Sequence, residues 1–234
     1  MERLPIAVCV PHSGTRIPEE VAGLCALSAD QLTSGCETWL AELCGPLIDC
    51  VEVFATTKIA RTIVDLDRDP GDRGPDGVIK THTPSAVPVY RSFPPERVVA
   101  ALLARYHHSF HEQLARRAER AMIGLDWHAS TRNGKRSPSD DAPPIVGLHA
   151  SEQVPRPWVR ALAWAFESTF DVEPTIRWRD APGYIARSAP GDIPWVRIDL
   201  MLSEPGGLDV ETVRRTLVRF NWRVNNRRGR SHPD

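Results

Sequence analysis

Short runs of apolar and β-branched residues recur along the chain, separated by longer stretches in which apolar residues repeat every three or four positions. The short runs are typical of buried strands: Ile6–Val10, Val51–Ala55, Thr62–Leu66, Met122–Trp127, Pro144–Leu148, Thr175–Trp178 and Trp195–Leu200. The longer stretches have the period of amphipathic helices: Glu37–Leu47, Pro95–Ala121, Pro157–Phe170 and Val210–Val224. This alternation predicts an α/β layered fold with a mainly parallel central sheet.

Two long polar segments interrupt these elements without ending their rhythm. Residues 69–89 are rich in Gly, Pro and Asp, and residues 131–144 are polar with Gly and Pro. Loops of this length are typical of binding loops or lids. Because the same elements resume after each loop, we expect one domain over residues 1–234, with a frayed tail from residue 227.

Composition narrows the classes of partner and the compartment. The formal net charge is −1, so no overall field favours nucleic acid or an anionic membrane, and no apolar run approaches the roughly 18 residues that would span a bilayer. The arginines of residues 214–230 fit the solvated face of a helix better than a nucleic-acid surface. Five cysteines, an odd number, lie in the first 50 residues without a leader before them. We therefore expect a cytoplasmic protein with free, mostly buried thiols.

Ligand-type residues follow or interrupt several of the predicted strands. His12 comes directly after the first strand, Asp67 after the third, and His128 after the run that ends near Leu125, while Asp199 interrupts the last strand. In open α/β sheets, ligands bind beyond the carboxyl ends of the strands. The sequence therefore predicts one site at this edge.

The two histidines favour a zinc ion at that site. Neutral imidazole is a preferred zinc ligand, and a catalytic zinc uses three protein ligands and one open position. The residues alone leave the third ligand open among Glu19, Glu20 and Glu37. The alternative reading is two loop histidines that bind backbone groups.

A second histidine group lies on the longest predicted helix. His107 and His111 are four positions apart, a spacing that can bind zinc, with His108 beside them. No glutamate stands between them as a base, so we favour surface or pocket-lining histidines.

The segment from Arg61 to Pro70 places three acids and two arginines around one predicted strand. Arginine near a zinc site either polarises a carbonyl oxygen or binds a substrate carboxylate through its planar fork. A structural network of aspartates and arginines is the alternative.

From Pro5 to about Glu204 the chain resembles the N-formylglutamate amidohydrolase family. Eight motifs carry the resemblance in the same order: Pro11–Gly14 with Ile17-Pro18, Glu37–Leu43, Val64–Pro70, Arg105–His111, Leu125–Ser130, Ile145–Gly147, Gly183–Ile185 and Arg197–Leu200. The resemblance implies a three-layer α/β/α sandwich with a mixed, mainly parallel sheet, like that of zinc carboxypeptidases and aspartoacylase-like deacylases.

The resemblance also implies roles for particular residues. His12, Glu37 and His128 fall where the family holds one Zn²⁺ per chain. Arg61 falls where relatives polarise the scissile carbonyl, and Asp199 replaces the catalytic glutamate.

The substrate-binding residues implied by the resemblance are Arg68, Asp67 and Tyr184. Asp67 stands where the family has an asparagine, so we expect its charge either to repel a substrate carboxylate or to pair with Arg68. The expected activity is zinc-dependent removal of a formyl or other small acyl group from an N-acylated amino acid, such as N-formylglutamate. A relative that binds a small metabolite without turnover is the alternative.

Overall fold

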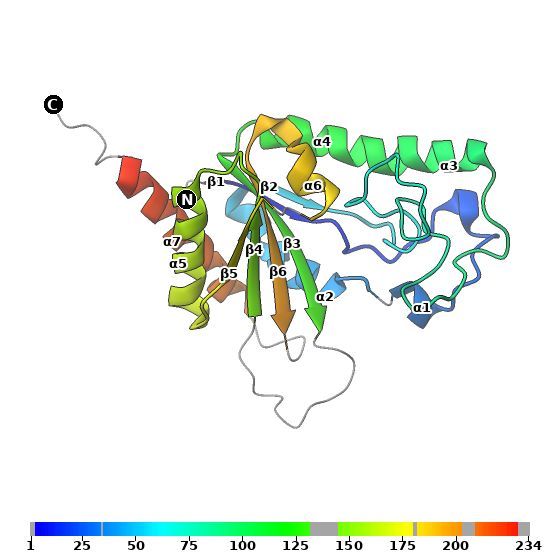
Figure 1. Cartoon of the computed structure of the whole chain (residues 1–234), viewed down its shortest axis with the longest axis horizontal. Coiled ribbons are helices and arrows are strands. Elements are labelled where there is room, and N and C mark those ends of the chain that lie inside the picture. Colours follow the sequence, from blue (N-terminus) through cyan, green and yellow to red (C-terminus); the bar gives the residue numbers. More distant parts are fainter. Residues whose placement is uncertain (1–2, 34, 132–144, 180–181, 203–208, 229–234) are drawn as a thin grey trace, which may run out of the picture.

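The computed structural model describes residues 3–33, 35–131, 145–179, 182–202 and 209–228, and within them a six-stranded sheet has the order β2-β1-β3-β6-β4-β5. The strands are β1 (Leu4–Val10), β2 (Val51–Thr56), β3 (Ile123–Thr131), β4 (Ile145–Ala150), β5 (Thr175–Trp178) and β6 (Trp195–Leu202). β2, β1, β3 and β6 are parallel, whereas β4 pairs antiparallel with β6 and parallel with β5. The sheet is mixed and mainly parallel, as predicted (Figure 1).

Helices cover both faces of the sheet (Figure 1). They are α1 (Ala29–Thr33), α2 (Thr38–Cys44), α3 (Glu96–Leu102), the π-helical segment η3 (Leu103–His108), α4 (Ser109–Ala118), α5 (Arg156–Phe170), α6 (Tyr184–Ser188) and α7 (Val210–Arg228), with short 3-10 turns at Glu19–Val21 (η1), Gly45–Asp49 (η2) and Pro190–Asp192 (η4). Side chains of α2, α5 and α7 form one core with the sheet, and side chains of α4 and α6 form another. The predicted α/β/α sandwich is therefore confirmed.

The central strand β1 shows why the sequence gives these layers. Its residues are buried on both faces, which is typical of a parallel strand between helices. Ile6 and Val8 point into the core under α2, α5 and α7, while the smaller Ala7 and Cys9 face α4 and α6. All five cysteines are free, and three of them are buried, as expected of small apolar residues.

The predicted strand Thr62–Leu66 is wrong. The segment forms a turn in which the amides of Ile63 and Val64 donate to the carbonyl of Ala60. Its apolar side chains are buried in a third core, beneath α3, with Val78 and Val99. The β-branched run therefore reflects burial under a helix instead of strand pairing.

The long loops differ from the regular elements around them. Residues 69–89 form turns and one isolated bridge, between His82 and Pro88. The prediction for residues 132–144 and that for the tail from residue 229 lie outside the described residues. In the part of the chain that the structure describes, no helix combines the length and the apolar character needed to cross a membrane.

Candidate metal centre

Three polar residues meet beyond the carboxyl ends of β1 and β3. His12 lies in the turn directly after β1, His128 lies in β3, and Glu37 immediately precedes α2. The amide of Glu37 donates to the carbonyl of His12 at 2.7 Å, which ties the start of α2 to the turn. At Gly14 in the same turn, a Cβ atom would lie 2.3 Å from the backbone of Lys58, so the close approach requires glycine.

The donor atoms of these three residues face one another. Nδ1 of His12 and Nδ1 of His128 are 3.2 Å apart. Oε1 of Glu37 lies 3.3 Å from the first nitrogen and 3.7 Å from the second. All three side chains are buried. Of the three acids that the sequence left open as a third ligand, Glu20 instead binds Arg105 and Glu19 is exposed.

A buried carboxylate stands behind each histidine. Nε2 of His12 is 2.9 Å from Asp65, and Nε2 of His128 is 3.0 Å from Asp126. Burial disfavours the charged imidazole, but the charge of Asp126 outweighs it and raises the pKa of His128 to about 10. Burial also opposes ionisation of Glu37, yet its contacts with His12 and His128 lower its pKa to about 2.

Asp67 offers a second arrangement of ligands. His12, Asp67 and His128 present ligand atoms that all lie within 4.8 Å of one another. Oδ2 of Asp67 is 3.5 Å from Nε2 of His128, but it also accepts from Nη1 of Arg197 at 2.7 Å. Burial, followed by the neighbouring charge of Asp126, raises the pKa of Asp67 to about 6.

Cations surround Asp65. Arg61 lies 3.4 Å from its carboxylate and 4.0 Å from Glu37, and the buried ammonium of Lys80 lies 3.0 Å from it. Burial would raise the pKa of Asp65, but His12, Arg61 and Lys80 hold it well below its usual range. The segment Arg61–Pro70 was a predicted site segment, but Asp65 itself had no predicted role. Lys80 was not among the predicted site residues. Asp65 stood in a predicted strand and Lys80 in a predicted loop, so local sequence gave no sign that the two side chains pair.

Asp199 lies on β6 directly beside His128 in the strand register. Its carboxylate accepts from Nε of Arg197 at 2.9 Å and is 3.0 Å from Nε2 of His149, and its side chain is 37% exposed. Arg197 therefore links Asp199 to Asp67. Arg197 had no predicted role, although its position two residues before Asp199 places both on the same face of the strand.

The expected pair of Asp67 and Arg68 does not form. The guanidinium of Arg68 is partly exposed and contacts Asp76, while Arg197 takes the place beside Asp67. Tyr184 begins α6, where its amide donates to the carbonyl of Asp67 at 2.9 Å.

The helix histidines bind backbone groups. Nε2 of His107 lies 2.8 Å from the carbonyl oxygen of Arg68, and Nε2 of His111 lies 2.8 Å from that of Leu66. Burial lowers the pKa of His107, and it lowers that of His111 to about 4, so both rings are neutral donors near pH 7. They hold the Asp65–Asp69 segment and belong to no candidate metal group among the described residues.

Imidazoles and carboxylates thus gather at the carboxyl ends of the parallel strands of an α/β/α sandwich. Together they form a buried candidate metal site. A family model described as N-formylglutamate amidohydrolase matches residues 4–201, and the chain therefore belongs to this family of hydrolases.

Two crystal structures have a similar fold. One is the N-formylglutamate amidohydrolase from Ralstonia eutropha JMP134, with 19% identity, a TM-score of 0.71, and coverage of 98% of this chain and 96% of that chain. The other is the gene product Atu2144 from Agrobacterium tumefaciens, with 15% identity, a TM-score of 0.67, and coverage of 95% and 90%. A search of curated proteins gave no match.

Proposed function

We propose that this chain is a cytoplasmic, zinc-dependent amidohydrolase that removes a formyl or other small acyl group from an N-acylated amino acid. Residues 1–234 would act as one catalytic domain. Membership of the amidohydrolase family supports a small-molecule substrate. The observation that carries the metal proposal is the convergence of three buried lone-pair donors at His12, Glu37 and His128.

The carboxylates of Asp65 and Asp126 indicate which nitrogen of each histidine carries a proton and which faces the site. Asp65 is ionised and only accepts, so His12 donates to it from Nε2 and leaves a lone pair on Nδ1. The raised pKa of His128 allows a proton on both of its nitrogens; a bound metal ion would displace the proton on Nδ1 and leave the other on Nε2, facing Asp126. These two lone pairs and the carboxylate oxygen of Glu37 then face one point, as the ligands of a single cation would. A carboxylate behind each ligating histidine is also the usual arrangement at zinc sites.

The spacing of the donors favours Glu37 over Asp67 as the third ligand. Tetrahedral zinc with ligands at about 2.1 Å requires donor atoms about 3.4 Å apart. The three distances among His12, Glu37 and His128 are 3.2, 3.3 and 3.7 Å. The carboxylate of Asp67 is instead engaged by Arg197, and it approaches the nitrogen of His128 that faces Asp126.

The surrounding side chains supply the remaining chemistry. When bound, zinc lowers the pKa of water and polarises carbonyl groups. Asp199, beside His128 and partly open to solvent, would accept the proton of the attacking water and return it to the leaving amine nitrogen. Arg61, which lies next to Glu37, would donate to the carbonyl oxygen of the substrate.

Substrate binding would fall to the segment after Leu66 and to α6. Among the described residues the guanidinium of Arg68 pairs only with the exposed Asp76, so it is available to a substrate carboxylate. The charge of Asp67 is compensated by Arg197, which removes the repulsion expected from the sequence. Tyr184 stays a prediction for substrate contact, since its ring packs 4.9 Å from His111.

The test is acid release from N-formyl and N-acetyl amino acids, N-formylglutamate included, with zinc present. We expect turnover by the wild-type protein and a loss of roughly 10²–10⁴-fold in kcat for Asp199→Asn. Asp49→Asn, on an exposed turn before β2, serves as the matched control and keeps wild-type kcat. Saturable binding of these compounds without any acid release would instead identify the non-catalytic relative.

A further inference from the structure

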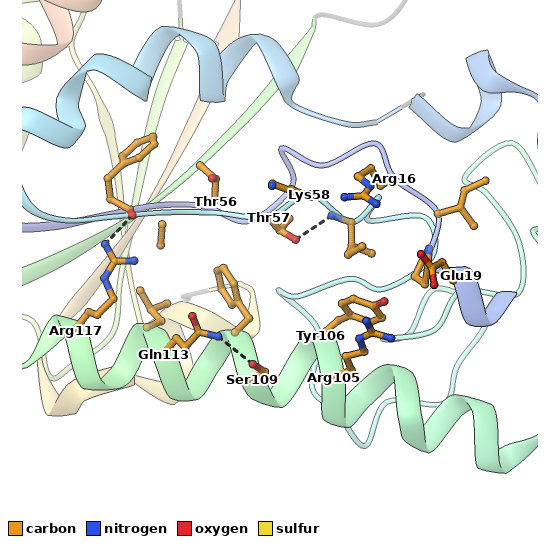
Figure 2. Close-up of a pocket in the computed structure, with 17 residues that line it drawn as sticks. Arg16, Glu19, Thr56, Thr57, Lys58, Arg105, Tyr106, Ser109, Gln113 and Arg117 are labelled. Atoms are coloured by element: carbon orange, nitrogen blue, oxygen red, sulfur yellow. Dashed lines mark hydrogen bonds between the residues drawn. The ribbon is translucent and has the colours of Figure 1, made fainter. Parts of the chain in front are cut away.

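A pocket lined by none of the proposed zinc ligands lies between helix α4 and the end of the edge strand β2 (Figure 2). Its volume is ≈ 480 Å³, within the range of small-molecule sites. None of the residues that line it belongs to the candidate metal centre or to the proposed substrate-binding set. Arg16 lies just after the turn that carries His12. The proposed hydrolase mechanism therefore leaves this pocket unassigned.

One wall of the pocket is a polar stripe along the helix. Arg105, Ser109, Gln113 and Arg117 follow one another at intervals of four residues, which places them on one face. The stripe extends over roughly 18 Å, from twelve residues at about 1.5 Å each. Phe110 and Leu114 lie beside it and add apolar surface between the two arginines. The wall suits a long ligand with polar ends.

The opposite wall carries two further cations. Thr56, Thr57 and Lys58 continue from β2, and the amide of Arg16 donates to the carbonyl of Lys58 at 2.8 Å, which fixes the two cationic residues side by side. Figure 2 shows Arg16 and Lys58 together on this wall, with Arg117 toward the other end of the pocket.

Charge in the pocket is strongly unbalanced. Four cationic residues line it against the single carboxylate of Glu19, although the whole chain has a net charge of −1. Arg105 is neutralised by Glu20 at 2.9 Å, and Arg117 binds the carbonyl of Phe54 at 3.3 Å. Within the described residues, the side chains of Arg16 and Lys58 have no hydrogen bond or ion pair. Two exposed cations held together without a partner favour an anionic ligand.

We propose that this pocket binds an elongated organic dianion. One anionic end would lie at Arg16 and Lys58, an apolar body along Phe110 and Leu114, and the second anionic end toward Arg117. Carboxylate and phosphoryl groups share the required chemistry. The proposal does not depend on the proposed hydrolase activity, because it uses none of the catalytic residues.

Calorimetric titration of the full-length protein at low salt tests the proposal with two probes, octanedioate and hexane-1,6-diyl bisphosphate. We expect saturable binding of at least one, and the one that binds identifies the anionic group. Octane-1,8-diol, the neutral counterpart, should not bind. Affinity should fall as salt is added, because exposed charges are screened.

Two variants test whether the probes bind in this pocket. Arg16→Ala/Lys58→Ala should weaken binding at least tenfold, whereas Arg116→Ala, an exposed arginine of α4 that does not line the pocket, should change it less than twofold. The proposal is overturned if neither dianion binds, if the diol binds as well as the dianions, or if the double variant binds like the wild type.

Discussion

Two halves of the candidate centre are held in place by different means. His12, His128 and Asp199 lie on or directly after neighbouring parallel strands, where the backbone ladder fixes each position. Asp65 and Asp67 lie in the irregular segment that connects β2 to α3. One half of the centre therefore depends on the sheet and the other on individual side-chain contacts.

The contacts that hold the irregular half come from elements far away in sequence. His107 and His111 bind its carbonyls, Arg197 and the amide of Ile185 bind the carboxylate of Asp67, and Lys80 binds Asp65. A π-helical segment carries His107, and such segments occur often at functional sites. We therefore expect the irregular half to be the more sensitive to single substitutions and to pH.

The largest effect is expected at Asp65, where the two halves meet. Asp65→Ala leaves the buried Lys80 without its buried partner and removes the carboxylate behind His12. Removing one partner of a buried ion pair costs about 3–5 kcal/mol, so the free energy of unfolding in urea should fall by that amount. Asp76→Ala, which removes the exposed partner of Lys80, should cost about 1 kcal/mol or less. Equal losses of unfolding free energy in the two variants would show that the buried pair with Asp65 contributes no more than the exposed pair with Asp76.

A smaller effect is expected at the helix histidines. His111→Ala leaves the carbonyl of Leu66 without its donor, which costs about 1–3 kcal/mol of unfolding free energy. The displaced segment should also lower kcat, whereas the metal content stays at the wild-type value because His111 contacts none of the proposed ligands. Denaturation, metal analysis and the split between kcat and KM measure these three quantities.

Two further variants separate a positioning role of His111 from a general loss of structure. His111→Gln keeps an amide donor at about the reach of Nε2 and should recover most of the lost kcat. His108→Ala, at the exposed neighbour on the same helix, should behave like the wild type. If glutamine recovers nothing while His108→Ala is equally impaired, the positioning role of His111 is wrong.

The smallest effect is a pH dependence. The pKa of His111 is about 4 in the folded protein because the ring is buried, against about 6.5 in an unfolded chain. The unfolded state therefore binds the proton first as the pH falls. The contribution of the neutral ring to stability is complete above pH 6.5 and is lost progressively between pH 6.5 and 4, with a slope of at most about 1.4 kcal/mol per pH unit. In His111→Gln this slope should be shallower, and an unchanged slope would assign the loss to other groups.

The sequence predicted the strand-borne half well. His12 and His128 follow apolar runs whose length and composition are those of strands, and the carboxyl ends of parallel strands meet at one edge. Six of the seven predicted strands are present. Glu37 was one of three open acids from the residues alone, because its approach to His12 depends on a backbone hydrogen bond across the fold.

The irregular half was predicted less well. The run Thr62–Leu66 has the composition of a strand, and local sequence carries no sign that α3 covers it. For the same reason the pairing of Asp67 with Arg197, and the burial of Lys80 beside Asp65, could not be derived: each joins residues that only the tertiary structure brings together. The register of β6 against β3, by contrast, places Asp199 beside His128 once both strands are known.

The proposed zinc site is tested most sharply by the zinc content of purified Glu37→Gln and Asp67→Asn beside the wild-type protein. Both variants replace a buried carboxylate near His12 and His128 by an amide of the same shape. We expect one zinc per wild-type chain, a near-complete loss in Glu37→Gln, and retention in Asp67→Asn. Full zinc in Glu37→Gln with loss in Asp67→Asn would rule out Glu37 and assign the third ligand to Asp67.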